Sequence, residues 1–275
     1  MENCKVIAVT NQKGGVGKTT TAVNLGVALA KQNKNILLID ADPQGSLTVS
    51  LGVKNPDSLD IALATVMQDV IEDRAFLPSD GIIHHAEGID LMPSNIELSG
   101  LETALFSVMS RESILKSYVK KVKGNYDYVL IDCMPSLGMM TINALTAADS
   151  VIIPTQPNFL SAKGMDLLFR SIAKVKRSIN PDLKIDGVLM TMVDGRTNNA
   201  RDVTASLRAT VGQKIRVFDT EIPHSVRAAE CSQMGKSIFA HDPNGKVADA
   251  YERLGKEVLR LEERSIDRPG NEWVR

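Results

Sequence analysis

The sequence has few cysteines, no surplus of either charge and no long apolar run. Its three cysteines, Cys4, Cys133 and Cys231, are widely spaced and form no CxxC pair, which argues against a disulfide framework and against a zinc or iron–sulfur site and favours a reducing cytoplasm. The formal net charge of −1 means that any binding to nucleic acid or anionic lipid must come from a local patch. No stretch approaches about 18 consecutive apolar residues, and no basic leader precedes the first apolar run, so we expect neither a membrane span nor secretion.

The chain does have enough apolar residues for a large core, at 43% of 275 residues. Short apolar runs alternate with stretches of helical periodicity, and the runs are continuous, as in strands that are covered on both faces. We therefore predict an α/β fold with a doubly wound, mostly parallel sheet. The expected strands are 6–10, 36–40, 89–92, 128–132, 151–154 and 185–192. The expected helices are 18–31, 111–123, 139–147, 161–179, 198–211 and 246–263.

No repeat, low-complexity tract or linker divides the chain, so we predict one domain over residues 1–264 and a polar tail over 265–275. Trp273 is the residue of the tail that we expect to anchor. Residues 56–85 have broken periodicity and mixed charges, which indicates short helices and loops at the edge of the fold. The last helix carries an apolar stripe that we expect to dock on the core. This stripe consists of Val247, Ala250, Leu254, Val258 and Leu261.

The stretch "NQKGGVGKTTTAVN", which begins at residue 11, stands between a predicted strand and a predicted helix. Its glycines lack side chains, so the backbone can turn sharply and aim N–H groups at phosphate oxygens, beside the positive end of the helix. Lys18 would then lie along the β- and γ-phosphates, and Thr19 would offer its hydroxyl to Mg²⁺. A plain glycine-rich turn is the alternative. The residues predicted to contact the nucleotide are Gly14, Gly15, Val16, Gly17, Lys18, Thr19 and Thr20.

Nucleotide hydrolysis also needs carboxylates near the metal and the attacking water, at the carboxyl ends of neighbouring strands. Asp40 and Asp42 end a predicted strand in "LLIDADPQG", and Asp132 ends another in "YVLIDCMPS". A single aspartate after a strand is often only a turn former or a helix cap. Three of them beside a phosphate loop predict a site for ATP and Mg²⁺.

Four segments together resemble the ParA/Soj partition ATPases, within the ParA/MinD group of deviant Walker A P-loop NTPases. They are "KGGVGKTT", "LLIDADPQGS", "DYVLIDCMPSLGMMTINALTAADSVIIPTQP" and "IPHSVRAAE", and the similarity runs from about residue 5 to residue 261. Met134 and His224 depart from the family pattern, which has proline and arginine there, and "LSAKG" replaces "ALEG".

The resemblance implies roles for individual residues. Lys13 is the signature lysine, which in this family reaches across an ATP-sandwiched dimer to the partner's nucleotide, so it joins both the catalytic and the nucleotide-binding residues. Asp42 orients the attacking water, while Asp40 and Asp132 support Thr19 and the Mg²⁺ shell. The adenine ring lies near Met192 and Pro223.

The resemblance also implies a function: an ATPase, weak alone, that forms a homodimer in ATP, binds DNA without sequence preference and is stimulated by a ParB-like partner. Its location would be cytoplasmic and nucleoid-associated. Arg196 and Arg227 match arginine-bearing segments of the family and are the expected DNA contacts. Because so few residues precede the first expected strand, we expect no N-terminal helix-turn-helix.

Three other functions fit the sequence less well. Membrane-surface positioning, as in the MinD branch, needs a basic C-terminal amphipathic helix, whereas the last helix here carries Glu252, Glu257, Glu262 and Glu263. An electron-transfer ATPase that resembles nitrogenase iron protein needs cluster-binding cysteines, and Cys133 is better explained as small buried packing. A metabolic P-loop ligase could share the loop, but no substrate-specific constellation supports one.

Overall fold

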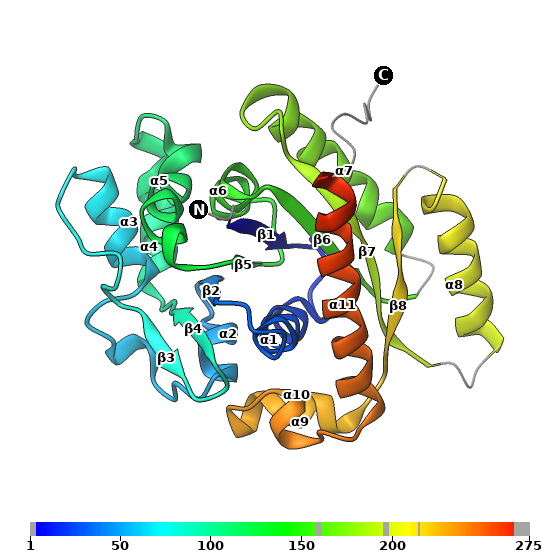
Figure 1. The fold of residues 1–275 in the computed structure, drawn as a ribbon. Coiled ribbons are helices and arrows are strands. Elements are labelled where there is room, and N and C mark those ends of the chain that lie inside the picture. The colour runs from blue at the N-terminus through cyan, green and yellow to red at the C-terminus, as the bar shows by residue number, and fades with distance from the viewer. Residues whose placement is uncertain (1–3, 158–160, 195–197, 214, 267–275) are drawn as a thin grey trace.

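The computed structural model describes residues 4–157, 161–194, 198–213 and 215–266. Across them runs an eight-stranded sheet in the order β3-β4-β2-β5-β1-β6-β7-β8 (Figure 1). All neighbouring strands are parallel except β3 and β4, which confirms the predicted mostly parallel sheet. The strands are β1 (Lys5–Val9), β2 (Ile36–Ala41), β3 (Ile83–His85), β4 (Ile89–Met92), β5 (Tyr128–Cys133), β6 (Ser150–Thr155), β7 (Lys184–Val193) and β8 (Val217–Pro223).

Helices cover both faces of the sheet, as a doubly wound fold requires. One face carries α3 (Leu63–Ile71), α4 (Glu97–Ala104), α5 (Ile114–Val122), α6 (Met139–Ala147), α7 (Ser161–Ser178) and α8 (Asn198–Val211). The other carries α1 (Lys18–Ala30), α2 (Ser46–Ser50), α9 (Val226–Met234), α10 (Ile238–His241) and α11 (Lys246–Ile266). Short 3₁₀ turns occur at Pro56–Ser58, Leu105–Ser107, Arg111–Ser113 and Lys123–Asn125.

Two hydrophobic cores result, because successive strand residues point to opposite faces. In β1, Val6 and Ala8 enter one core, while Ile7 and Val9 enter the other. The strands are thus buried on both faces, which explains their continuous apolar sequences. Cys133 is 1% exposed and belongs to the first core, which confirms the expected packing role.

All six predicted strands and all six predicted helices are present, with ends that shift by up to three residues. The sequence did not predict β3, β8, α2, α4, α9 or α10. The segment 56–85 was predicted as peripheral, yet it includes α3, which contributes four buried side chains to the core. These are Leu63, Ala64, Val66 and Met67.

The last helix docks its apolar stripe as predicted: α11 packs on α1 and β8, with Val247, Ala250, Leu254 and Val258 buried (Figure 1). The helix extends to Ile266, so residues 264–266 are helical and the predicted boundary at 264 falls inside it. The rest of the predicted tail, with Trp273, lies outside the described residues. No helix in the described part of the chain is long and apolar enough to cross a membrane.

Candidate functional site

The loop between β1 and α1 has the geometry of an open cradle. Gly15 and Gly17 have φ angles of 69° and 81°, a left-handed conformation that glycine adopts without steric cost. A Cβ atom added to Gly14 or Gly15 would meet none of the described atoms within 4 Å, so the outer side of the loop has room for a ligand. Val16 is buried and Thr20 lies in the first turn of α1. The N-terminus of α1 points its free N–H groups toward this space.

The two lysines of the loop have different environments. Lys18 is only 7% exposed, and its Nζ donates a hydrogen bond to the Lys13 carbonyl oxygen at 3.3 Å. Burial lowers the pKa of Lys18, and the nearby Asp132 carboxylate partly opposes that shift. Lys13 is exposed. Lys18 therefore belongs to the interior of the site, whereas Lys13 faces the solvent.

Thr19 and Asp132 make a polar pair behind the loop. The Thr19 hydroxyl donates to Asp132 Oδ2 at 2.7 Å, and Asp132 is 1% exposed. Burial, reinforced by the neighbouring Asp40, raises the pKa of Asp132 well above its ordinary value. Its second oxygen, Oδ1, is buried and has no hydrogen-bond partner among the described residues. A hydrated Mg²⁺ at this point would satisfy that oxygen, so the pair fits the predicted metal site.

Asp40 lies opposite Asp132 in the register of β2 and β5 and is fully buried. Its Oδ2 accepts hydrogen bonds from the Thr48 backbone N–H at 2.8 Å and the Thr48 hydroxyl at 2.7 Å, and its Oδ1 accepts from the Asp42 N–H at 3.2 Å. Burial raises the pKa of Asp40 to about 6. These contacts hold the turn that carries Asp42. The half-buried Asp42 caps that turn, since its Oδ1 accepts from the Gln44 N–H at 2.9 Å.

The part of the chain that the structure describes contains no group of three or more His, Cys, Asp or Glu side chains able to hold a metal ion. This agrees with the way proteins hold Mg²⁺, with one or two protein ligands, substrate phosphates and water. The predicted set Thr19, Asp40 and Asp132 thus divides: Thr19 and Asp132 face each other, and the oxygens of Asp40 are engaged by the turn after β2.

Asn11 anchors the first half of the loop to β6. Its side-chain amide donates to the Pro154 carbonyl at 2.8 Å and to Thr155 Oγ1 at 3.1 Å, and its Oδ1 accepts from the Lys13 backbone N–H at 3.1 Å. Asn11 is 4% exposed. Asn11 was not predicted as a site residue from the sequence, although a polar side chain that directly follows a buried strand was a signal.

The second half of the loop is held from the ends of β6 and β7. The buried Thr191 hydroxyl donates to the Val16 carbonyl at 2.8 Å, and the Gln156 amide donates to the Gly15 carbonyl at 2.9 Å. Met192 has a φ angle of 53°, and its Cε lies 3.7 Å from the position of a Cβ on Gly17. Thr191 and Gln156 were also missed by the sequence analysis.

Three of the residues predicted to contact adenine or DNA, namely Met192, Pro223 and Arg227, lie near this end of the sheet. Pro223 pairs with Val193, directly after Met192, across β7 and β8. Pro223 and Arg227 line one pocket of about 310 Å³. The Arg227 side chain is 63% exposed, and its Nη1 lies 3.3 Å from Asp242 Oδ1. Arg196 lies outside the described residues.

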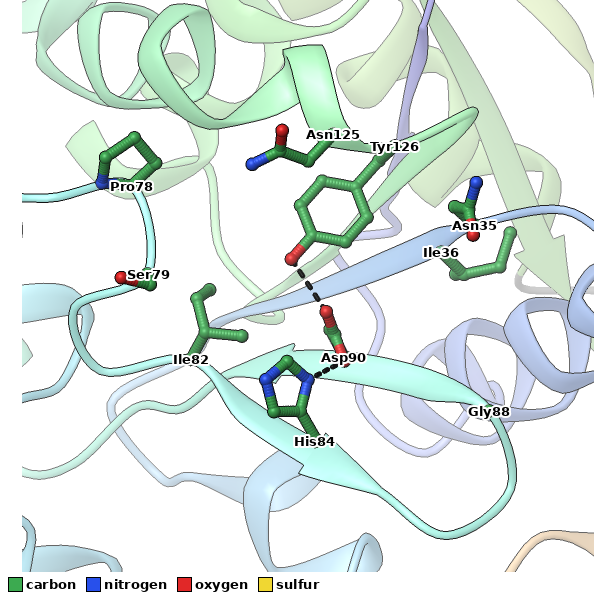
Figure 2. A pocket seen from close by; sticks show the side chains of 10 residues that line it. All are labelled: Asn35, Ile36, Pro78, Ser79, Ile82, His84, Gly88, Asp90, Asn125 and Tyr126. Carbon is green, nitrogen blue, oxygen red and sulfur yellow. Dashed lines mark hydrogen bonds and ion pairs between the residues drawn. The ribbon is translucent and has the colours of Figure 1, made fainter.

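A second pocket of about 310 Å³ opens at the other edge of the sheet, where β2 begins. Figure 2 shows Tyr126 and His84 directed at Asp90 from either side: the Tyr126 hydroxyl donates to Oδ2 at 2.8 Å, and His84 Nδ1 lies 2.5 Å from Oδ1. None of the predicted site residues lines this second pocket. The phosphate loop therefore remains the candidate site.

Comparison with known proteins relates this site to nucleotide-dependent proteins. Residues 4–185 match the AAA domain family. The chain is 44% identical over 254 residues to the sporulation initiation inhibitor protein Soj of Bacillus subtilis, covering 92% of this chain and 98% of Soj. It is 40% identical to the chromosome partitioning protein ParA of Caulobacter vibrioides, covering 94% of this chain and 95% of ParA.

A solved structure, that of cobyrinic acid a,c-diamide synthase from Mycobacterium smegmatis with a bound ATP analog and magnesium, is 37% identical to the chain. It has a TM-score of 0.83 and covers 98% of this chain and all of its own. The same protein has also been solved with ADP and magnesium.

Proposed function

This chain belongs to the ParA/Soj family of partitioning ATPases, and from that membership and the geometry of its loop we propose that it is an ATP-driven switch that positions DNA. ATP would join two subunits into a dimer, the dimer would bind DNA without sequence preference, and a ParB-like partner would stimulate hydrolysis and release it. The protein would act in the cytoplasm, on the nucleoid, as a single ATPase domain over residues 1–264.

The observation that carries this proposal is the contrast between the two lysines of the loop. Lys18 is buried beside Asp132 and would neutralise the β- and γ-phosphates of its own nucleotide. Lys13 is exposed on the same loop. A charge in that position can complete the site of a second subunit, which explains why a phosphate loop has two lysines.

The reaction would be the attack of water on the γ-phosphorus of ATP, and the remaining roles follow from the contacts. Mg²⁺ supplies charge neutralisation at the β- and γ-phosphates when bound. Thr19 and Asp132 would hold it, since the Thr19 hydroxyl donates to one Asp132 oxygen and the other, buried, has no hydrogen-bond partner among the described residues. Asp42 would orient the water, and Asp40 would position Asp42 through its bond to the Asp42 N–H.

The loop backbone would bind the phosphates through Gly14, Gly15, Val16 and Gly17, with Thr20 as a further contact. Adenine would lie against Met192 and Pro223. DNA would contact Arg196 and Arg227, and the 63% exposure of the Arg227 side chain supports that assignment. Each ion pair with a phosphate releases counterions, so the patch would act most strongly when two subunits combine their arginines.

The test of this function is ATP-dependent dimerisation. In an Asp42→Ala background, which should block hydrolysis and accumulate a DNA-bound dimer, light scattering after size exclusion should show a dimer in ATP. Adding Lys13→Ala should return the protein to a monomer, because the second subunit's nucleotide loses its neutralising charge. Lys54→Ala, which removes another exposed lysine, is the control and should remain dimeric. A dimer in the Lys13→Ala protein would contradict the proposal.

A second candidate is ATP-dependent amide formation, which the name of the M. smegmatis protein suggests. Both functions would use the same loop. Incubation with cobyrinic acid, glutamine and ATP separates them, because a ligase would form the diamide and consume ATP in proportion, without any requirement for DNA.

Membrane positioning is less well supported, since the apolar stripe of α11 is buried against the core. Two glutamates of that helix also serve the fold. Glu257 accepts bonds from Arg216 and two backbone N–H groups, and Glu262 accepts from the Tyr128 hydroxyl. Electron transfer through a shared cluster is likewise disfavoured because Cys133 and Cys231 are buried.

A further inference from the structure

We propose that Asn11 is the positioning residue for Lys13: its buried carboxamide ties the first half of the phosphate loop to the end of β6 and thereby sets the direction in which Lys13 leaves the loop. The inference rests on the role proposed for Lys13 in the dimer. It concerns a residue that would touch neither nucleotide nor metal and would act only through Lys13.

The contacts of Asn11 fix its side chain completely. One amide group donates to both the Pro154 carbonyl and Thr155 Oγ1, at 2.8 and 3.1 Å, while the oxygen accepts the Lys13 N–H at 3.1 Å. At 4% exposure, the Asn11 side chain has little access to water that could take the place of these partners. The Thr10 N–H also bonds to the Ile152 carbonyl at 3.1 Å, so Asn11 continues the contacts with β6 past the end of β1.

The second half of the loop has its own anchors. Thr191, at the end of β7, holds the Val16 carbonyl at 2.8 Å, and Lys18 follows two residues later at the start of α1. The Nζ of Lys18 donates a hydrogen bond to the Lys13 carbonyl oxygen at 3.3 Å, so the two halves of the loop are in contact there. Loss of the Asn11 contacts should therefore disturb Lys13 more than Lys18, and loss of the Thr191 contact should do the opposite.

The test separates nucleotide binding within one subunit from dimerisation. Asn11→Asp keeps an acceptor for the Lys13 N–H but loses both donated bonds, and Asn11→Ala removes the side chain without burying a charge. Thr191→Val is the matched control, since it deletes one hydroxyl at nearly constant shape. Affinity for a fluorescent ADP analogue reports on the single subunit, and light scattering with ATP, in the Asp42→Ala background, reports on the dimer.

We expect both Asn11 variants to weaken ATP-dependent dimerisation at least about tenfold while their ADP affinity stays within about threefold of the parent. Thr191→Val should instead weaken ADP binding. Asn11 variants that dimerise like the parent, or that lose ADP affinity as strongly as dimerisation, would overturn the inference. If Lys13→Ala still dimerises, the proposed function itself fails; if Lys13→Ala is monomeric and Asn11→Asp is not, only the role of Asn11 fails.

Hydrogen exchange on the unmodified protein provides a measurement that does not depend on how the variants fold. The Lys13 amide hydrogen, held by Asn11 Oδ1, should exchange more slowly than an unprotected amide of the same sequence. Exchange at the unprotected rate would show that the Asn11 contact does not persist in solution and would overturn the inference.

Discussion

The buried aspartates behind the phosphate loop should make the nucleotide-free protein less stable as the pH rises. Asp40 is fully buried, and burial raises its pKa from 3.8 to about 6. The folded state therefore holds this proton more tightly than the unfolded state. Below a pH of about 3.8 the Asp40 carboxyl is protonated in both states, so its burial does not lower the free energy of unfolding. As the pH rises from there through about 6, the unfolded state loses this proton more readily than the folded state, so the free energy of unfolding falls. The shift corresponds to about 3 kcal/mol, of which about 1.4 kcal/mol develops between about pH 5 and about pH 7.5.

Urea denaturation of the nucleotide-free protein at these two pH values measures the effect. Between the lower and the higher pH, the parent should lose about 1.4 kcal/mol of unfolding free energy that Asp40→Asn does not lose, because the amide has no proton that titrates in this range. Asp60→Asn, at an exposed position, controls for the loss of one negative charge. Saturating Mg²⁺ and ADP should reduce the difference, since a cation nearby stabilises the ionised carboxylates. An identical pH dependence in parent and Asp40→Asn would refute the reasoning.

Two further predictions concern DNA binding and the packing of α9. Arg227→Ala should weaken ATP-dependent binding to all DNA sequences alike and reduce by about 1 the slope of log affinity against log salt concentration. Replacing Arg253, an exposed arginine on α11, by alanine should change neither. Retardation assays over a range of salt concentrations would measure both variants, and an unchanged slope for Arg227→Ala would contradict the assignment. Gly235→Ala should cost about 2–5 kcal/mol in urea denaturation, because its φ is 63° and the new Cβ would lie 2.6 Å from Gly52 Cα. Gly124→Ala, where a Cβ meets nothing within 4 Å among the described residues, should change stability little, and equal effects for the two glycines would refute the steric argument.

The central strands were predictable because burial on both faces demands continuous apolar residues, as in "VLID" of β5. β8 was not, because its residues alternate between buried and more exposed positions at the edge of the sheet. Helix periodicity failed where helices are too short or too exposed to show it. α10 has four residues, and α9 buries only Cys231.

The phosphate loop and the strand-ending aspartates were predictable because each is encoded in one short segment. The anchors of the loop were not, since they depend on which strands become neighbours. Asn11 is hydrogen-bonded to Pro154, 143 residues away in the sequence, and Thr191 to Val16, 175 residues away. The different environments of the two buried aspartates could not be predicted either. The oxygens of Asp40 accept hydrogen bonds from the turn after β2, whereas Asp132 keeps one buried oxygen without a partner among the described residues.

The exposure of Lys13 bears on how hydrolysis could be tied to dimerisation. In a single subunit its ammonium is exposed to water, where a charge attracts a phosphate only weakly. In the proposed dimer the same ammonium would face the partner subunit's nucleotide with water excluded, and their attraction would be several-fold stronger than in water. Lys18, already at 7% exposure, would gain little from the same closure. Under the proposed function, hydrolysis would depend on dimerisation because Lys13 would meet a phosphate in a water-excluded site only when a second subunit is present.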